Sequence, residues 1–347
     1  MDSRIVEQIQ VKNFKSLKNL QMDGCKRINL LIGRPNVGKS NLLEAMSLYC
    51  LPFVLRSKDA SLRLLVRAGH LGELFFDGSM NDGIEVNING TDIVSITSKQ
   101  HNGGSITIRI GSKVIGEYGL TQDLELSKGQ QNSSDAPKVL FYKYTMMNRW
   151  MSSGTQQLLP PSGANLMEVV KQIPMLKDEI SGLMASYGLK MVYDNVSQEL
   201  KALKEKSDEI FLIPFSSLAD SLQRMIFYKA AILSNHGKVI CMEEPETHTF
   251  PPYIASVVQD IIDAEDNQFF ISTHSPYVAN SLMESVSDDL AIYFVNMVDG
   301  ETTVKRASDA DVDEIYANGV DMFFKMEKKE NRFTSSDEEL KRIFSQK

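Results

Sequence analysis

Residues 33–40 read Gly-Arg-Pro-Asn-Val-Gly-Lys-Ser and follow directly on the apolar run Ile-Asn-Leu-Leu-Ile at positions 28–32. A helical pattern begins immediately afterwards and extends from about Ser40 to Tyr49. The order strand, G-x-x-x-x-G-K-S, helix is typical of a phosphate-binding loop, because its glycines let successive backbone N–H groups point inward at phosphate oxygens. The N-terminus of the helix adds partial positive charge. A glycine turn that binds nothing is the alternative interpretation.

The side chains of this loop predict ATP and Mg²⁺ as ligands. Lys39 is expected to reach the β- and γ-phosphates, and the hydroxyl of Ser40 is expected to take a Mg²⁺ coordination position. The residues that we expect to contact the nucleotide here are Arg34, Pro35, Asn36, Val37, Gly38, Lys39, Ser40 and Asn41.

Two adjacent acids, Glu243 and Glu244, end a second apolar run at positions 239–242. Open α/β sheets bind their ligands at the carboxyl ends of the strands. We expect Glu243 to hold Mg²⁺, directly or through water, and Glu244 to position or deprotonate the attacking water. Aspartate is usual at the first of these positions, and the longer glutamate points to slow hydrolysis. The alternative is a pair of solvated acids that begin a turn.

His274 follows another apolar strand pattern, at positions 268–272. A histidine at the end of such a strand can form a hydrogen bond to a γ-phosphate and so respond to its presence. We therefore group it with Lys39 and Glu244 as the expected catalytic residues. A lone histidine is usually a structural residue, which is the alternative here.

A fourth segment, residues 217–224, opens a helical pattern with small and hydroxylated residues. The backbone N–H groups at such a helix start can receive a phosphate. An ordinary helix cap, with Asp220 or Ser221 as the N-cap residue, explains the segment equally well.

Composition sets broad limits on the class of protein. The chain has 347 residues and a formal net charge of −8, which argues against generic wrapping of nucleic acid, although a local basic patch remains compatible. Its three cysteines show no C-x-x-C spacing and are expected to be buried thiols in a reducing compartment. No stretch has the length of a membrane span, and no signal pattern opens the chain, so we expect a cytoplasmic protein that does not contact membranes.

Taken together, the motifs resemble those of the ABC-type ATPase heads of the RecF, SMC and OLD group. Val-Lys-Asn-Phe-Lys-Ser-Leu at 11–17 looks like the opening strand signature of that group, Glu-Glu-Pro-Glu-Thr-His at 243–248 resembles its Walker B and D-loop, and Ser-Thr-His-Ser-Pro at 272–276 is similar to its switch histidine segment. The resemblance spans about residues 4–300, with residues 75–205 matched only in outline.

The resemblance implies a dimer in which the signature loop of one subunit closes on the γ-phosphate held by the other. The matching residues are Ala219, Asp220 and Ser221, and Arg224 is a supplementary candidate. The group usually has serine where Ala219 stands, and often glycine where Ser221 stands. These departures weaken the expected contact, although Ser221 offers a substitute hydroxyl.

Two other segments imitate functional motifs. Residues 151–157 look even more like an ABC signature, but they run into Pro160-Pro161, which ends a helix. The acidic run at 309–314 suggests calcium or a nuclease metal site, but Glu314 stands where a calcium loop needs glycine. We interpret it as an acid-rich helix start. The 73 residues after His274 are too few for the Toprim nuclease domain of OLD-type nucleases.

The expected fold is an α/β P-loop NTPase domain of the ABC-ATPase head type, with an inserted antiparallel β subdomain and a helical lobe. The expected parts are the first part of the ATPase domain with the phosphate loop (1–75), the antiparallel subdomain (76–145), the helical lobe (146–208), the second part of the ATPase domain (209–300) and a charged C-terminal tail (301–347). Helical patterns are expected over about 165–206, and strands over 139–144 and 210–214.

These expectations lead to one favoured function and two alternatives. The favoured function is a slow, partner-regulated ATPase that acts as a nucleotide-driven switch, a homodimer or higher oligomer, serving as the sensor of a bacterial defence system with a protein effector as its partner. The alternatives are a RecF-like DNA repair or maintenance ATPase, which would bind nucleic acid, and a nucleotide-gated scaffold with little turnover.

Overall fold

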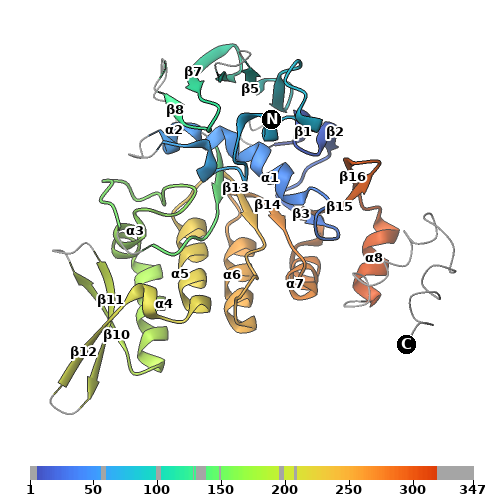
Figure 1. Cartoon of the computed structure of the whole chain (residues 1–347). Coiled ribbons are helices and arrows are strands. Elements are labelled where there is room, and N and C mark those ends of the chain that lie inside the picture. The colour runs from blue at the N-terminus through green and yellow to red at the C-terminus, as the bar shows by residue number, and fades with distance from the viewer. Residues whose placement is uncertain are drawn as a thin grey trace, which may run out of the picture.

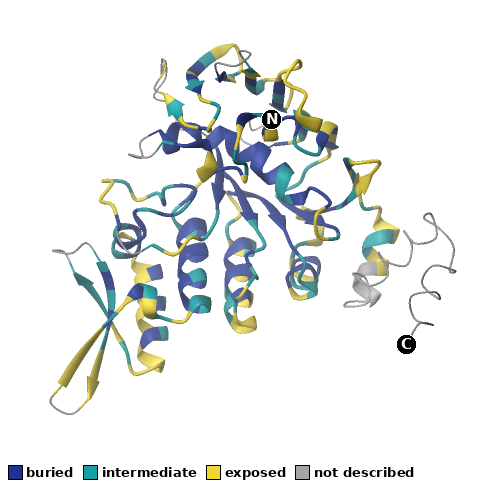
Figure 2. Ribbon diagram, viewed as in Figure 1, coloured by how far each residue is buried: buried dark blue, intermediate teal, exposed yellow. Residues whose placement is uncertain are grey.

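A six-stranded sheet forms the centre of the molecule. The computed structural model describes residues 6–55, 60–98, 103–127, 129, 138–147, 150–194, 199–206 and 209–318. The sheet has the order β16-β15-β3-β14-β13-β9, and all strands except the edge strand β16 run parallel. Its strands are β3 (Ile28–Ile32), β9 (Val139–Tyr142), β13 (Val239–Glu243), β14 (Gln268–Ser272), β15 (Leu290–Val298) and β16 (Glu301–Arg306). The inner strands are mostly apolar and almost wholly buried because both faces of the sheet are covered (Figure 2).

Helices cover the two faces of this sheet unequally (Figure 1). One face packs against α1 and the antiparallel sheet described below, and the other face packs against α3, α5, α6 and α7. The helices are α1 (Lys39–Ser47), α2 (Leu51–Val54), α3 (Leu166–Gln172), α4 (Pro174–Ser186), α5 (Asp220–Leu233), α6 (Pro251–Asp263), α7 (Pro276–Val286) and α8 (Asp309–Asn318). Short 3₁₀ turns occupy Leu48–Cys50, Leu62–Leu64, Leu71–Leu74, Phe76–Gly78, Phe215–Ser217 and Ser287–Asp289.

A seven-stranded antiparallel sheet of order β2-β1-β4-β5-β6-β7-β8 lies above α1. Its strands are β1 (Gln8–Phe14), β2 (Leu17–Asp23), β4 (Ile84–Ile88), β5 (Asp92–Ser98), β6 (Gly104–Ile110), β7 (Lys113–Leu120) and β8 (Leu126–Ser127). Alternating residues face the core, as the period of two predicts. The N-terminal hairpin belongs to this sheet, so the antiparallel part is not confined to residues 76–145.

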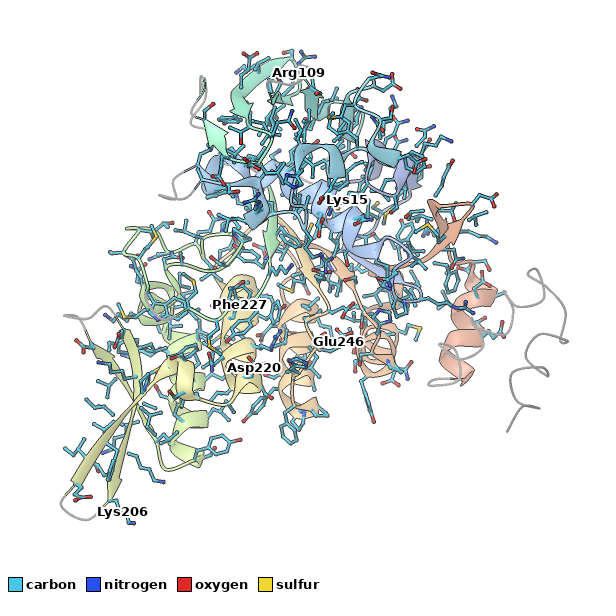
Figure 3. The ribbon with its side chains drawn as sticks, viewed as in Figure 1. Lys15, Arg109, Lys206, Asp220, Phe227 and Glu246 are labelled. Atoms are coloured by element: carbon cyan, nitrogen blue, oxygen red, sulfur yellow. The ribbon has the colours of Figure 1, made fainter. Side chains whose placement is uncertain are left out.

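A third, three-stranded sheet projects from the molecule. Its first two strands correct the prediction of helix up to about residue 206, and its last strand confirms the strand expected over 210–214. Its strands are β10 (Lys190–Asp194), β11 (Glu199–Lys206) and β12 (Glu209–Pro214). Lys206 lies near the end of this sheet, far from Arg109 on the antiparallel sheet (Figure 3). Residues 199–206 contain good helix formers, but Leu200 and Ala202 alternate with charged residues and are both buried. Burial of this alternating face outweighs intrinsic helix propensity.

Three further predictions were wrong in detail. Val139–Tyr142 pairs with β13 in the central sheet instead of joining the antiparallel part. Residues 301–306, expected to begin a charged tail, form β16 on the edge of the central sheet. Helix α5 has Ala219 as its N-cap residue, with no side-chain capping bond, so neither Asp220 nor Ser221 caps it. The acid-rich helix start is confirmed as α8, and residues 319–347 lie outside the described residues. Within the described residues, no helix is long and apolar enough to cross a membrane.

Candidate nucleotide-binding site

The loop between β3 and α1 contains two positions that require glycine. A Cβ atom on Gly33 would lie 2.2 Å from the backbone oxygen of Val295. A Cβ atom on Gly38 would lie 2.0 Å from Oγ1 of Thr302, and Gly38 has a φ of 100° as the N-cap of α1. The loop therefore approaches β15 and β16 so closely that a side chain at either position would displace it.

Lys39, at the first position of α1, turns back onto this loop. Its ammonium group donates hydrogen bonds to the backbone oxygens of Gly33, at 2.8 Å, and Arg34, at 2.7 Å. Burial lowers the pKa of Lys39 to about 8, although Glu244 and Glu243 raise it in part. A lysine held in this way is a partly desolvated cation, and such a cation binds an anion more strongly than one in water.

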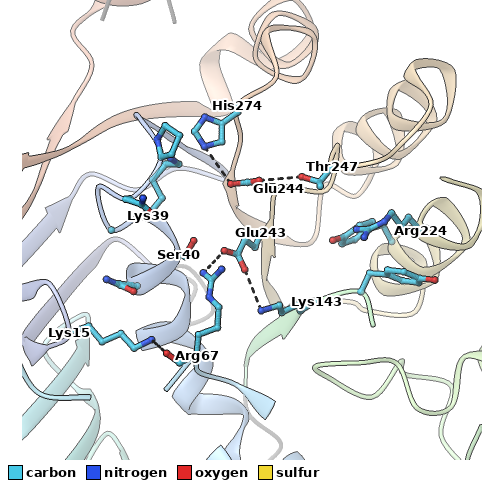
Figure 4. A pocket seen from close by; sticks show the side chains of 16 residues that line it. Lys15, Lys39, Ser40, Arg67, Lys143, Arg224, Glu243, Glu244, Thr247 and His274 are labelled. Carbon is cyan, nitrogen blue, oxygen red and sulfur yellow. Dashed lines mark hydrogen bonds and ion pairs between the residues drawn. The ribbon is translucent and has the colours of Figure 1, made fainter. Parts of the chain in front are cut away.

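A pocket of about 760 Å³ brings most of the predicted site residues together (Figure 4). Lys39 and Ser40 line it beside Glu243, Glu244 and His274. Its lining residues are Lys15, Pro35, Asn36, Gly38, Lys39, Ser40, Asn41, Arg67, Lys143, Tyr144, Arg224, Tyr228, Glu243, Glu244, Thr247 and His274. Arg34 and Val37 are not among them, and Val37 instead packs into the core.

Glu244 and His274 face each other across this pocket. Nε2 of His274 lies 3.4 Å from Oε1 of Glu244, and the hydroxyl of Thr247 donates to Oε2 of Glu244 at 3.2 Å. Glu244 has a φ of 42°, and its backbone N–H donates to the oxygen of Ser272 at 3.0 Å. The pKa of His274 is lowered, first by burial and then by Lys39. The lowered pKa favours the neutral imidazole, which has one N–H donor and one acceptor nitrogen.

Glu246 holds the histidine segment and was not predicted as a site residue. Its Oε1 atom accepts hydrogen bonds from the backbone N–H of His274 and from the hydroxyl of Thr273, both at 2.8 Å. Its other oxygen is buried and has no hydrogen-bond partner among the described residues. Burial raises the pKa of Glu246. The sequence could have indicated Glu246, because it lies in the segment 243–248 that resembles Walker B and the D-loop. No role was predicted for this acid.

Glu243 has basic neighbours that the sequence did not indicate. Arg67 donates from Nη2 to Oε1 of Glu243 at 2.6 Å, and Nζ of Lys143 lies 3.9 Å from Oε2. Arg67 comes from a loop 176 positions earlier in the chain. No local pattern marks either cation, because only the folded chain brings their segments to the end of β13.

Ser40 and Glu243 offer the oxygen atoms that a Mg²⁺ ion prefers. No group of three or more His, Cys, Asp or Glu residues suited to a metal occurs among the described residues. Mg²⁺ usually takes one or two protein ligands and completes its shell with phosphate oxygens and water. A hydroxyl and a carboxylate beside a phosphate loop fit this ion.

The predicted signature residues lie outside the pocket lining of their own chain. Ser221 donates its hydroxyl to the backbone oxygen of His248 at 2.9 Å, and Asp220 accepts from Nε of Arg224 at 2.7 Å. Arg224 does line the pocket, with its guanidinium 4.7 Å from the ring centre of Tyr144. The segment at 151–157 forms no helix, and Glu168 accepts from the backbone N–H groups of Ser153 and Gly154.

Comparison with known proteins gives distant similarities. No known family model matches the chain. A protein of Helicobacter pylori called "ATP/GTP phosphatase" is 22% identical over 324 residues, covering 78% of this chain and 85% of the relative. An uncharacterised protein of Methanocaldococcus jannaschii is 28% identical over 109 residues, covering 28% of this chain and 48% of that protein.

Solved structures with a similar chain path include heads of SMC proteins. An Smc head bound to the C-winged helix domain of ScpA has a TM-score of 0.49 at 14% identity and covers 89% of this chain and 99% of that one. An Smc head bound to the C-terminal domain of ScpA derived from Pyrococcus furiosus gives 0.49 at 14%, covering 90% and 98%. The SMC head domain from Thermotoga maritima gives 0.39 at 13%, covering 87% and 99%.

Proposed function

We propose that this protein binds ATP with Mg²⁺ and hydrolyses it slowly, as an ATPase of the ABC head type. One observation carries the proposal: Lys39 and Ser40 of the phosphate loop share a pocket with Glu243, Glu244 and His274, which come from the ends of two other strands. The Helicobacter pylori relative, named as an ATP/GTP phosphatase, supports the same chemistry.

Each residue has a distinct role in this proposal. Backbone N–H groups of residues 36–40 and the ammonium group of Lys39 bind the phosphates. Ser40 and Glu243 hold Mg²⁺, which neutralises phosphate charge when it is bound.

Glu244 is the general base of the proposed reaction. It accepts a proton from the attacking water through Oε1, the atom that faces His274, while the hydroxyl of Thr247 fixes Oε2. The neutral His274 ring has a single N–H, which it can give either to Glu244 or to the terminal phosphate. In this proposal the N–H goes to the phosphate when substrate is bound, which links the base to the presence of substrate. Glu246 and Thr273 hold the backbone beneath the ring.

We further propose that two subunits enclose two nucleotides, with residues 217–224 of each subunit completing the site of the other. Ser221 and Asp220 are partly exposed and lie outside the pocket lining of their own chain, which is compatible with this arrangement. In this proposal the ATPase is the sensor of a bacterial defence system that acts on a protein effector. A RecF-like role on DNA and a scaffold with little turnover are the alternatives; the ion pairs on Glu243 favour slow turnover.

The Glu244→Gln variant tests this function. It keeps the shape of the site but removes the base, so it should bind ATP as the unaltered protein does, lose turnover and accumulate as an ATP-dependent dimer in mass measurements. Glu265→Gln, an exposed acid on the loop before β14, is the matched control and should change nothing. If the unaltered protein and Glu244→Gln hydrolyse ATP equally slowly, the proposed hydrolytic function is wrong. If neither protein binds ATP, the proposed nucleotide site is wrong.

A further inference from the structure

The carboxylate of Glu243 has a basic side chain near each of its oxygen atoms. Nη2 of Arg67 is 2.6 Å from Oε1, and Nζ of Lys143 is 3.9 Å from Oε2. The side chain of Glu243 is only 11% exposed, so water alone would solvate its charge poorly. The two cations neutralise the acid to which the proposed function assigns the metal.

Arg67 is fixed from its other side by Glu44 of α1. Its Nε atom donates to Oε1 of Glu44 at 2.7 Å, and its backbone N–H donates to Oε2 at 3.3 Å. Lys15 pairs with the same carboxylate and donates to the backbone oxygen of Arg67 at 3.0 Å. The side chain of Glu44 is 2% exposed. The stem of Arg67 is therefore anchored by a buried acid, while its Nη2 end bridges to Glu243.

These contacts form a row of five charges that alternate in sign, and all of them except Glu44 line the pocket. The row runs from Lys15 through Glu44, Arg67 and Glu243 to Lys143, each member bonded to or near the next. The members come from the β1–β2 turn, helix α1, the loop after the Leu62–Leu64 turn, and the ends of β13 and β9. A carboxylate oxygen that accepts a charge-assisted hydrogen bond from a guanidinium cannot at the same time bind a divalent ion at full strength.

We propose that Arg67 sets the metal requirement of this site: its guanidinium holds Glu243, and a divalent cation must replace it there. Metal binding is then an exchange of one cation for another on the same oxygen, not an addition. The inference rests on the proposed function for the role of Glu243. Because Glu44 keeps the stem of Arg67 in place, the exchange needs only the Nη2 end to move, and the loop that carries Arg67 stays attached to α1.

The test is a Mg²⁺ titration of nucleotide binding. A fluorescent ATP analogue, held at a subsaturating concentration, is titrated with MgCl₂ in the unaltered protein and in Arg67→Gln, and anisotropy gives the Mg²⁺ concentration for half-maximal binding. Removing the competing cation should lower that concentration roughly threefold to tenfold, which is less than a fully buried charge-assisted hydrogen bond would give because Arg67 is half-exposed. Arg63→Gln is the matched control, because Arg63 lies in the same segment, donates to the oxygen of Gly69 and does not line the pocket; it should leave the concentration unchanged.

Lys143→Gln adds a second arm to the experiment. At 3.9 Å its ammonium group is too distant for a hydrogen bond, so its removal should shift the Mg²⁺ concentration in the same direction but less. The proposed exchange is overturned if Arg67→Gln leaves the Mg²⁺ concentration for half-maximal binding unchanged or raises it. It is also overturned if this variant fails to bind the nucleotide at every Mg²⁺ concentration, or if Lys143→Gln has the larger effect. Failure of the unaltered protein to bind the analogue at all would instead overturn the proposed function.

Discussion

The hydroxyl of Thr302 donates a hydrogen bond to the backbone oxygen of Val37, 2.9 Å away, and so joins the edge strand β16 to the phosphate loop. Oγ1 of Thr302 also lies 2.6 Å from the hydroxyl oxygen of Ser16, and the backbone N–H of Thr302 donates to the oxygen of Ser16 at 2.8 Å. Asn41 donates to the same serine hydroxyl at 2.7 Å. Segments near both ends of the described chain thus hold the loop in one shape.

Thr302→Val should weaken nucleotide binding. The substitution keeps the shape of the buried side chain but leaves the oxygen of Val37 and the hydroxyl of Ser16 without this partner, at a cost of about 1–3 kcal/mol in stability. A loop that is less well fixed should bind ATP several-fold more weakly, measured by calorimetry. Thr303→Val is the control, because its exposed neighbouring hydroxyl bonds only weakly, at 3.4 Å, to the oxygen of Asn296. Equal ATP affinities for the two variants would contradict the role of Thr302.

Glu246 should act as a positioning residue for His274. Glu246→Gln retains an oxygen that accepts from the N–H of His274 and the hydroxyl of Thr273, so it should keep most of the turnover. Glu246→Ala removes that acceptor and leaves two donors unpaired, and the free energy of unfolding should fall by about 1–3 kcal/mol. The informative quantity is turnover at saturating ATP, with binding measured separately.

For Glu246→Ala we expect turnover to fall at least tenfold while ATP affinity changes little. A merely structural role would instead lower stability without changing turnover in the fraction of protein that remains folded. That result would remove Glu246 from the site.

Lys39→Met should stabilise the protein at neutral pH when nucleotide is not added. The pKa of Lys39 is lowered from 10.5 to about 8 in the folded chain, so the unfolded chain binds the proton more tightly. The charged lysine therefore opposes folding below pH 8, by up to about 3 kcal/mol, and this penalty disappears as the pH rises from 8 to 10.5.

Urea unfolding at pH 7.5 and pH 9.5 checks this sign. The stabilisation by Lys39→Met should be larger at the lower pH and shrink at the higher one. Lys12→Met, a substitution on the partly exposed side of β1, should show no such trend. A difference that grew with pH would contradict the buried position of Lys39.

Lys229 should be essential for the packing of α4, α5 and α6. Its side chain is 1% exposed and lies 2.6 Å from Asp260 and 3.0 Å from Glu179. Lys229→Met leaves the carboxylate of Asp260 buried without its partner, and breaking such a pair costs about 3–5 kcal/mol. Adding Asp260→Asn should recover a large part of the loss, because it removes the unpaired charge. Thermal unfolding of both variants measures the effect; no recovery in the double variant would show that charge is not the cause.

Much of the central sheet could be predicted from the sequence because three of its inner strands are short, mostly apolar runs. The runs that became β3, β13 and β14 are buried on both faces, and turn residues follow each of them. Glu243, Glu244 and His274 therefore lie at the same edge of the parallel sheet, and this placement does not depend on the structure of the intervening segments. For the same reason the predicted meeting of Lys39, Ser40, Glu243, Glu244 and His274 in one pocket agrees with the structure.

The segment 190–206 could not be predicted in the same way, whereas the strand expected over 210–214 is confirmed as part of β12. The lysines, glutamates and leucines of residues 190–206 have high intrinsic helix propensity, and the burial of Leu200 and Ala202 on one face selects the extended form. Residues 301–306 were likewise too polar to be recognised as a strand. Pairing with β15 and the buried hydroxyl of Thr302 place them in the central sheet.

The sequence by itself determined the glycine-containing loop at residues 33–38 and the polar residues at the strand ends, because glycine spacing and apolar runs are local properties of the chain. The tertiary structure alone decided which charges meet there. Arg67 reaches Glu243, Thr302 reaches Val37 and Glu246 reaches His274 through contacts between segments that are distant in the chain. Such pairings depend on how whole sheets pack, and the packing of sheets is set by the sum of many buried contacts, not by any short run of residues.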